Sequence, residues 1–271
     1  MKSAKIFWQS QSGNSYASVL AAKDALEENG WSVRLHHMLS DPPAAINENL
    51  VIFSFPVHNF KPAALTREFI KGISPAEKMV KALALVNCTG LMANVPYCLR
   101  KLLKEKNVDL AAAKKVRGAE TYILLRKYMG FSKRQDTLPD KMILDSVRDF
   151  IRRKLDDGMK HETMLFNPLS VWHWLGRISP DNAPGKAFYG RSWIKEKCTL
   201  CGNCYTFCPS RSIKRDSDVL SCNEETCVGC CGCFNICPVS AWQLKNYEEK
   251  YFLKNKKTPE LIKAVRGKER A

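Results

Sequence analysis

The chain has 271 residues, 45% of them apolar, and carries a formal net charge of +16. This length suffices for about two domains with buried cores. No apolar run approaches the roughly 18 residues of a membrane-spanning helix, and the N-terminus lacks the apolar segment of a signal peptide. We therefore expect a cytoplasmic protein without a membrane span.

Residues 1–138 alternate short apolar runs with amphipathic stretches. The run Leu50–Phe55 is almost wholly apolar, as expected of a strand that is buried on both faces. Alternation of strands and helices favours a parallel sheet with helices on both faces. Strands are expected at 4–9, 31–37, 50–55, 81–87 and 121–125, and helices at 15–29, 63–71 and 96–106.

Residues 139–190 form a connector between this domain and a cysteine-rich module at 191–241. The connector begins with a predicted helix at 141–155, which Pro139 precedes and Gly158 follows. Its later part contains several tryptophans and prolines. Residues 242–271 form a basic tail with a short helix expected near 259–265.

Ten of the twelve cysteines lie between Cys198 and Cys237. In a cytoplasmic chain this density indicates metal binding rather than disulfides. The spacing C-x2-C-x2-C-x3-C-P occurs twice and is the one internal repeat of the sequence. The first run consists of Cys198, Cys201, Cys204 and Cys208, and the second of Cys227, Cys230, Cys233 and Cys237.

Thiolates are the soft ligands that iron–sulfur clusters need, and the fourth cysteine of such a run ligates the other cluster. The doubled motif resembles the bacterial two-cluster ferredoxins. Two [4Fe–4S] clusters are therefore expected. Their ligands would be Cys198, Cys201, Cys204 and Cys237 for cluster one, and Cys227, Cys230, Cys233 and Cys208 for cluster two.

The alternative for these cysteines is a zinc module, although zinc sites seldom use this spacing followed by proline. Two further cysteines, Cys222 and Cys231, lie outside the repeated spacing. We expect both to be small packing residues rather than ligands.

A second candidate site follows the first predicted strand, where small polar residues open a helix. Hydroxyl groups, a glycine and backbone amides at a helix N-terminus suit a phosphate group. The same residue types also form ordinary helix caps. The segment consists of Ser10, Gln11, Ser12, Gly13, Asn14 and Ser15.

This segment resembles the phosphate loop [ST]-x-[ST]-G-x-[ST] of flavodoxins. The resemblance implies a flavodoxin-like doubly wound parallel sheet of strand order 2-1-3-4-5, with FMN at its switch point and a small α+β ferredoxin-like domain following. A flavodoxin-like fold without FMN is the alternative. The implied contacts of the flavin ring are Pro56, Val57, His58, Asn59 and Phe60 from one loop, and Thr89 and Gly90 from another.

Together the two halves resemble flavodoxin–ferredoxin fusion proteins of anaerobes. Clusters carry single electrons, whereas a flavin carries one or two. We therefore expect an electron-transfer protein that relays electrons between two [4Fe–4S] clusters and FMN. Its positive charge favours an acidic redox partner, such as a ferredoxin or a flavodoxin.

The alternative function is an FMN-dependent oxidoreductase that takes electrons from ferredoxin. It would reduce a small substrate such as a quinone, a tetrapyrrole or an unsaturated acid. No convincing general acid stands out in the sequence, so an electron carrier is favoured and no catalytic residue is assigned. Nucleic-acid binding is not expected, because no recognition motif is present. A homo-oligomer is compatible with the sequence.

Overall fold

The computed structural model describes residues 2–128, 141–163, 191–245, 247, 253 and 256–267. These residues form two compact units. The first contains residues 2–10, 14–118 and 141–163. The second contains residues 11–13, 119–128 and the described residues from 191 onward. Most of the predicted connector, including its tryptophans, lies outside the described residues.

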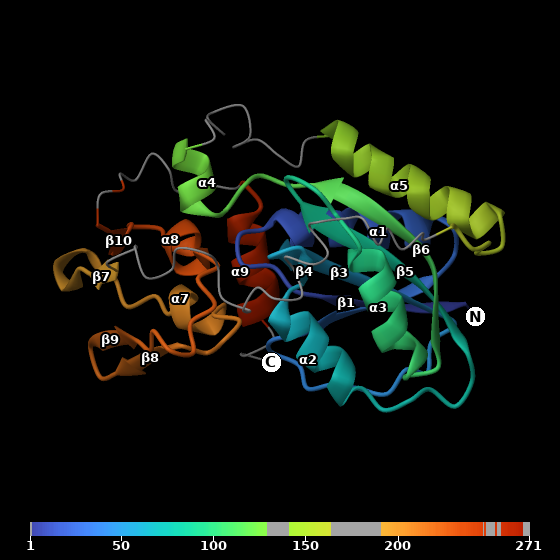
Figure 1. Cartoon of the computed structure of the whole chain (residues 1–271), viewed down its shortest axis with the longest axis horizontal. Coiled ribbons are helices and arrows are strands. Elements are labelled where there is room, and N and C mark those ends of the chain that lie inside the picture. The colour runs from blue at the N-terminus through green and yellow to red at the C-terminus, as the bar shows by residue number, and fades with distance from the viewer. Residues whose placement is uncertain are drawn as a thin grey trace. The chain divides into compact units, whose positions relative to one another are not determined.

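A parallel sheet forms the centre of the first unit (Figure 1). Its main strands pair in the order β2-β1-β3-β5-β6, and a short β4 (Lys61–Pro62) runs antiparallel to the end of β3. This order confirms the predicted flavodoxin-like order 2-1-3-4-5. The main strands are β1 (Ser3–Trp8), β2 (Ser32–His37), β3 (Leu50–His58), β5 (Val80–Cys88) and β6 (Val108–Arg117).

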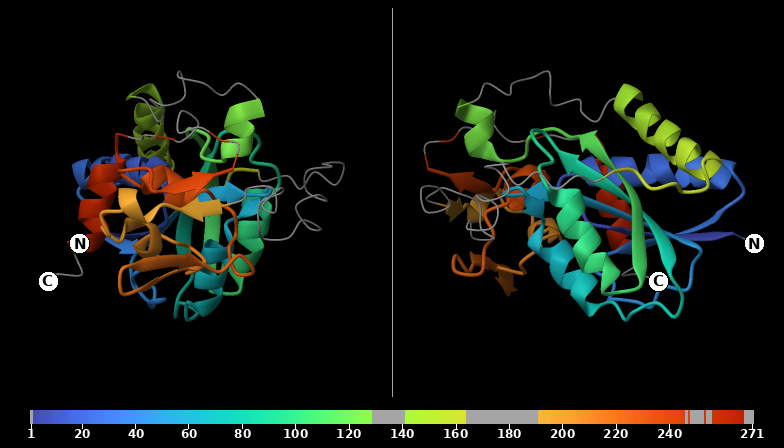
Figure 2. Two further views of the ribbon diagram at one scale, coloured as in Figure 1. Left: turned by 90° about the vertical axis from the view of Figure 1, so that its left-hand side faces the viewer. Right: turned by 45° about the vertical axis from the view of Figure 1, so that its right-hand side comes forward.

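Helices cover both faces of this sheet (Figures 1 and 2). Side chains alternate between the faces along each strand, so Phe7 and Phe53 share one face. There they pack in one hydrophobic cluster with Phe69 and Leu99 of the covering helices. That face is covered by α2 (Ala64–Gly72) and α3 (Val95–Lys104), and the other by α1 (Asn14–Glu28) and α5 (Lys141–Asp156).

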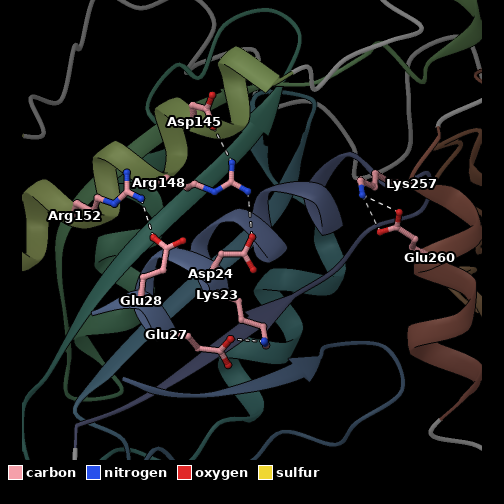
Figure 3. A network of polar contacts seen from close by, with 9 residues as sticks. All are labelled: Lys23, Asp24, Glu27, Glu28, Asp145, Arg148, Arg152, Lys257 and Glu260. Atoms are coloured by element: carbon pink, nitrogen blue, oxygen red, sulfur yellow. Dashed lines mark hydrogen bonds and ion pairs between the residues drawn. The ribbon is translucent and has the colours of Figure 1, made fainter. Parts of the chain in front are cut away.

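Helix α5 lies along α1, although more than a hundred residues separate them in the sequence. Figure 3 shows two ion pairs between these helices: Arg148 with Asp24 at 3.1 Å and Arg152 with Glu28 at 2.8 Å. Such partly exposed pairs contribute little to stability. The main contribution comes from the apolar side chains of α5, since Ile151 is fully buried.

The prediction of a last strand at 121–125 is wrong. The last strand of the sheet is β6, and helix α4 (Ile123–Tyr128) occupies the predicted strand region. The β6 sequence VDLAAAKKVR is rich in alanine and lysine, which have low strand propensity. Pairing with β5 and burial of Leu110 outweigh that propensity.

The second unit contains two antiparallel strand pairs, β7 with β10 and β8 with β9. Phe234 and Trp242 are buried between its elements. The helix predicted in the tail is confirmed as α9 (Thr258–Arg266). The other elements are β7 (Arg191–Trp193), the 3₁₀ helix η3 (Lys195–Lys197), α7 (Asn203–Thr206), β8 (Ile213–Asp216), β9 (Val219–Cys222), α8 (Gly232–Ile236) and β10 (Trp242–Leu244).

Among the helices that the structure describes, none has both the length and the apolar character needed to cross a bilayer.

A buried polar network ties the first turns of α1 to the sheet. The Ser18 hydroxyl donates to the Ser15 carbonyl at 2.8 Å and lies 3.0 Å from the Ser54 hydroxyl. The Asn87 amide donates to the Ser54 hydroxyl at 3.2 Å and to the Leu85 carbonyl at 3.1 Å. Strands β3 and β5 therefore hold the start of α1 in place.

Replacement of Asn87 by Ala should destabilise the first unit by about 1–3 kcal/mol, because buried partners lose their hydrogen bonds. The effect would be measured as the free energy of unfolding in urea, followed by circular dichroism. Asn47→Ala is the matched control, since that side chain is exposed. Equal stability of the two variants would contradict a structural role for this network.

Candidate metal centre and flavin site

The two cysteine runs adopt the same backbone conformation. Helix α7 begins five residues after Cys198, and α8 begins five residues after Cys227. Residues with left-handed φ angles occur at equivalent positions of the two runs, separated in the sequence by the same number of residues as Cys198 and Cys227. The equivalent pairs are Leu200 at 52° and Gly229 at 67°, Gly202 at 82° and Cys231 at 59°, and Arg211 at 50° and Ser240 at 49°.

The strands repeat in the same way, and the two halves of the module exchange them. Strand β7 of the first half pairs with β10 of the second, and β8 of the first pairs with β9 of the second. The registers are also equivalent, since Trp193 faces Trp242 and Cys222 faces Ile213. The sequence repeat is therefore a structural repeat with interleaved halves.

Backbone N–H groups donate to cysteine sulfurs at equivalent places in both halves. The Leu200 N–H donates to Cys198 Sγ at 3.4 Å, and the Gly229 N–H to Cys227 Sγ at 3.4 Å. Later in each run, the Ser212 N–H donates to Cys208 Sγ at 3.3 Å and the Ala241 N–H to Cys237 Sγ at 3.2 Å. Such hydrogen bonds stabilise the negative charge of a thiolate and tune the potential of a bound cluster.

Electrostatic neighbours show which cysteines lie together. Burial raises the pKa of Cys204 to about 11, and the nearby Cys201 and Cys237 add to the rise. Burial likewise raises the pKa of Cys230, and Cys208 contributes in the same direction.

In each case one of the electrostatic neighbours is the last cysteine of the other run, Cys237 for Cys204 and Cys208 for Cys230. This is the arrangement that a crossed ligand assignment requires. Cys198 packs in the hydrophobic cluster of the module, and its sulfur accepts the Leu200 N–H.

The two additional cysteines both lie near the second run. The Cys222 thiol hydrogen bonds to Cys227 and, together with Arg191, holds the pKa of Cys227 below that of an ordinary thiol. Cys231 is 3% exposed and is an electrostatic neighbour of Cys233. Sequence reasoning missed Arg191, because nothing in the cysteine spacing points to a residue so far upstream.

The donor set fits iron–sulfur clusters: eight thiols in two interleaved groups, with N–H donors to four of the sulfurs. In the described part of the chain, no three Cys, His, Asp or Glu side chains meet closely enough to hold a single metal ion.

The predicted phosphate loop follows β1 and opens α1. Gly13 has a φ of 101°, a left-handed conformation that glycine adopts without strain. Ser10, Asn14 and Ser15 belong to the first unit, and residues 11–13 to the second. All five non-glycine residues of the loop are buried, at 2–8% exposure.

Within the second unit, the loop contacts the tail helix. The Thr258 hydroxyl, at the first residue of α9, donates to the Ser12 carbonyl at 2.8 Å. This contact uses a carbonyl of the loop and none of the backbone N–H groups that a phosphate needs.

The residues predicted to flank a flavin ring lie at the carboxyl ends of β3 and β5. Pro56, Val57 and His58 extend β3 rather than forming a loop. Asn59 and Phe60, with φ angles of 49° and 60°, form the two-residue turn of the β3–β4 hairpin.

All five of these side chains are half-buried. After β5, the Thr89 hydroxyl donates to the Gly118 carbonyl at 3.0 Å, and Gly90 is exposed. In a sheet of this order, ligands bind beyond the carboxyl ends of the strands, at the switch point between β1 and β3. The hairpin and the loop after β5 therefore fit the place of a flavin ring, and the start of α1 fits its phosphate.

Comparison with known proteins supports the cysteine module directly. The family described as "4Fe-4S binding domain" matches residues 192–214, which include the first cysteine run. A search of curated proteins found no match.

Among solved structures, oxidised flavodoxin 1 from Bacillus cereus is similar at 13% identity and a TM-score of 0.43, covering 57% of this chain and 98% of that one. A flavodoxin from the domain Archaea is similar at 12% identity and a TM-score of 0.41, covering 59% and 99%. An FMN-dependent NADH-azoreductase from Bacillus anthracis str. Ames Ancestor is similar at 10% identity and a TM-score of 0.41, covering 59% and 100%.

These structural similarities are weak, and the assignment of the fold rests on the observed strand order. The chain joins a flavodoxin-like parallel sheet to a 4Fe-4S binding domain, and this combination is that of a flavodoxin–ferredoxin fusion.

Proposed function

We propose that this chain is an electron carrier that holds two [4Fe–4S] clusters and one FMN. The observation that carries the proposal is the repeated frame of N–H···S hydrogen bonds in two interleaved cysteine runs. The interleaving of the two runs supports ligand sets of the two-cluster ferredoxin kind, in which each cluster takes its fourth thiolate from the other run.

The chain's own residues have defined tasks in this proposal. Cys198, Cys201, Cys204 and Cys237 hold cluster one, and Cys227, Cys230, Cys233 and Cys208 hold cluster two. The backbone N–H groups of Leu200, Ser212, Gly229 and Ala241 stabilise the thiolate charge. The buried aromatic side chains around the cysteines exclude water from the clusters. Each cluster supplies one-electron chemistry when bound.

The iron content of paired cysteine variants tests the crossed ligand sets. Anaerobically purified wild type should contain about eight iron and about eight sulfide per chain, as two [4Fe–4S] clusters require. Cys208→Ser/Cys230→Ser removes two ligands of one cluster and should retain about four iron. Cys208→Ser/Cys201→Ser removes one ligand from each cluster and should retain the least iron.

The opposite ranking of the two double variants would show that each run holds its own cluster. Zinc in place of iron would reject the iron–sulfur assignment altogether. Cys88→Ser/Cys98→Ser is the matched control, because both cysteines lie in the first unit outside the module. This control should keep the full iron content.

FMN binding at the first unit is the second element of the proposal. It is supported by the strand order, by α1 beginning directly after the phosphate-loop motif, and by the half-buried hairpin at the end of β3. A flavin beside iron–sulfur clusters would convert between one- and two-electron transfer.

Flavin extraction and binding test this element. Purified protein should release about one FMN per chain, and Ser15→Ala, in the part of the loop that belongs to the first unit, should weaken FMN binding about tenfold, since a hydroxyl donor to a charged phosphate is lost. Ser74→Ala, at an exposed loop position, is the control and should bind FMN like wild type. Purified protein could contain its full iron but no flavin and also fail to bind added FMN. That result would show that the flavodoxin-like fold serves another purpose.

The competing function is an FMN-dependent oxidoreductase with a small organic substrate. One cavity of the first unit bears on it: about 190 Å³, lined by residues that include Met92, Asn94, Tyr97 and Glu162. Ligand sites typically enclose about 300–1,000 Å³. This cavity is smaller than that range and gives no support for a substrate site at this place; a carrier function is favoured because no general acid stands out in the sequence. Turnover of a quinone or an unsaturated acid with reduced ferredoxin would reverse this preference.

The expected partner is an acidic redox protein. A formal net charge of +16 favours rapid encounter with a ferredoxin or flavodoxin of opposite charge, and such encounter slows as salt rises.

A further inference from the structure

Arg191 places a buried positive charge against the sulfurs of the second run. Its Nη1 donates to Cys227 Sγ at 3.0 Å and to Cys222 Sγ at 3.2 Å. The side chain is only 5% exposed, and its guanidinium carbon lies 5.7 Å from the centroid of the Phe234 ring. A guanidinium does not lose its proton in proteins, so this charge is permanent.

The repeat provides a counterpart for Arg191 in the other half of the module. Arg191 faces Leu244 across the β7–β10 pair, and Leu220 faces Arg215 across the equivalent β8–β9 pair. The residue equivalent to Arg191 is therefore Leu220, which is buried and apolar. Arg215 is exposed, and its Nε donates to the Ser217 carbonyl rather than to a sulfur.

Backbone donors and the burial of the cysteines are balanced between the two proposed ligand sets, whereas the Ser210 hydroxyl, 3.8 Å from Cys208 Sγ, is an additional side-chain neighbour of the second set. Each set accepts two backbone N–H groups. Each also contains two buried and two half-buried cysteines. Arg266 lies near the first run, where it donates to the Cys201 carbonyl and the Asn203 side chain.

Among the described residues, the carboxylate of Glu224 pairs with Arg191. Glu224 Oε1 lies 3.4 Å from Arg191 Nε, and the Glu224 side chain is 53% exposed. Water screens the exposed Glu224 carboxylate more strongly than the buried Arg191 guanidinium. The net electrostatic effect of the pair on the nearby sulfurs is therefore that of a positive charge.

We propose that Arg191 makes cluster two, held by Cys227, Cys230, Cys233 and Cys208, the more easily reduced cluster. When both clusters are bound, an electron would be held preferentially at the set that contains Cys227. Its transfer within the module would oxidise cluster one and reduce cluster two by one electron each, with no other reactant. This inference rests on the proposed function.

The physical reason is that reduction adds one negative charge to a cluster. A charge-assisted hydrogen bond to a ligand sulfur stabilises the reduced form more than the oxidised form, and this raises the reduction potential. Removal of the Arg191 charge should lower the ratio of reduced cluster two to reduced cluster one about tenfold. For a one-electron couple, this change corresponds to a potential difference of about 59 mV.

Single-cluster proteins isolate the effect. Cys201→Ser removes a ligand of cluster one and leaves cluster two, whereas Cys230→Ser does the reverse. Arg191→Leu, which installs the residue of the equivalent position, is introduced into both, and potentials are measured by redox titration with electron paramagnetic resonance. The potential should fall by about 59 mV in the Cys201→Ser protein and stay unchanged in the Cys230→Ser protein.

Two further variants separate charge from structure. Arg191→Gln keeps a hydrogen-bond donor without the charge and should also lower the potential of cluster two. Arg191→Lys keeps the charge, so the potential of cluster two should stay close to that of the parent protein. Arg215→Leu removes an arginine from the equivalent strand pair and should change neither potential. Iron content should equal that of the parent in every variant.

An unchanged potential of cluster two in Arg191→Leu and Arg191→Gln would overturn the inference, as would an equal fall in both clusters. Loss of iron from both neutral variants would assign Arg191 to structure and also overturn it. Absence of iron from the parent proteins would instead reject the proposed function itself, so the two failures are distinguishable.

Discussion

The cysteine module depends on hydrogen bonds from backbone N–H groups to cysteine sulfurs. Thiolates packed among aromatic and aliphatic side chains repel one another, and burial raises the pKa of Cys204 and Cys230. A fold that brings such groups together must supply compensating positive charge or donors. Here the donors are Leu200, Ser212 and their counterparts in the second run, held by recurring left-handed turns.

The repeat makes the differences between its halves informative. Main-chain geometry is shared, so a difference in cluster chemistry must come from side chains at equivalent positions. Gly202 corresponds to Cys231, Trp193 to Cys222, and Leu220 to Arg191. All three differences place sulfur or charge around the second run. Under the proposed function, these differences would make the two clusters of a duplicated module unlike.

Much of this architecture was predictable from the sequence because strong local patterns agree with tertiary structure. The apolar run Leu50–Phe55 predicted a central strand, and the strand order followed from the resemblance to flavodoxins. Strand β6 was not predictable, because its alanines and lysines favour a strand only when paired with β5. The helix at 123–128 was missed for the opposite reason: its large apolar residues suit strands in isolation.

The candidate sites likewise include features that the sequence predicted and features that depend on tertiary structure. Cysteine spacing predicted which residues belong to the module, since eight thiols at that spacing have few other uses. It did not predict Arg191, whose role depends on the pairing of β7 with β10. The burial of Ser12 beneath Thr258 was also unpredictable, because 246 residues separate the two in sequence.

Anomalous diffraction at the iron absorption edge, from crystals grown without oxygen, tests the central claim most directly. The account predicts two compact iron peaks, one bonded to Cys198, Cys201, Cys204 and Cys237 and the other to the remaining four cysteines. Anomalous signal at the zinc edge instead, or an iron site bonded to all four cysteines of a single run, would contradict it.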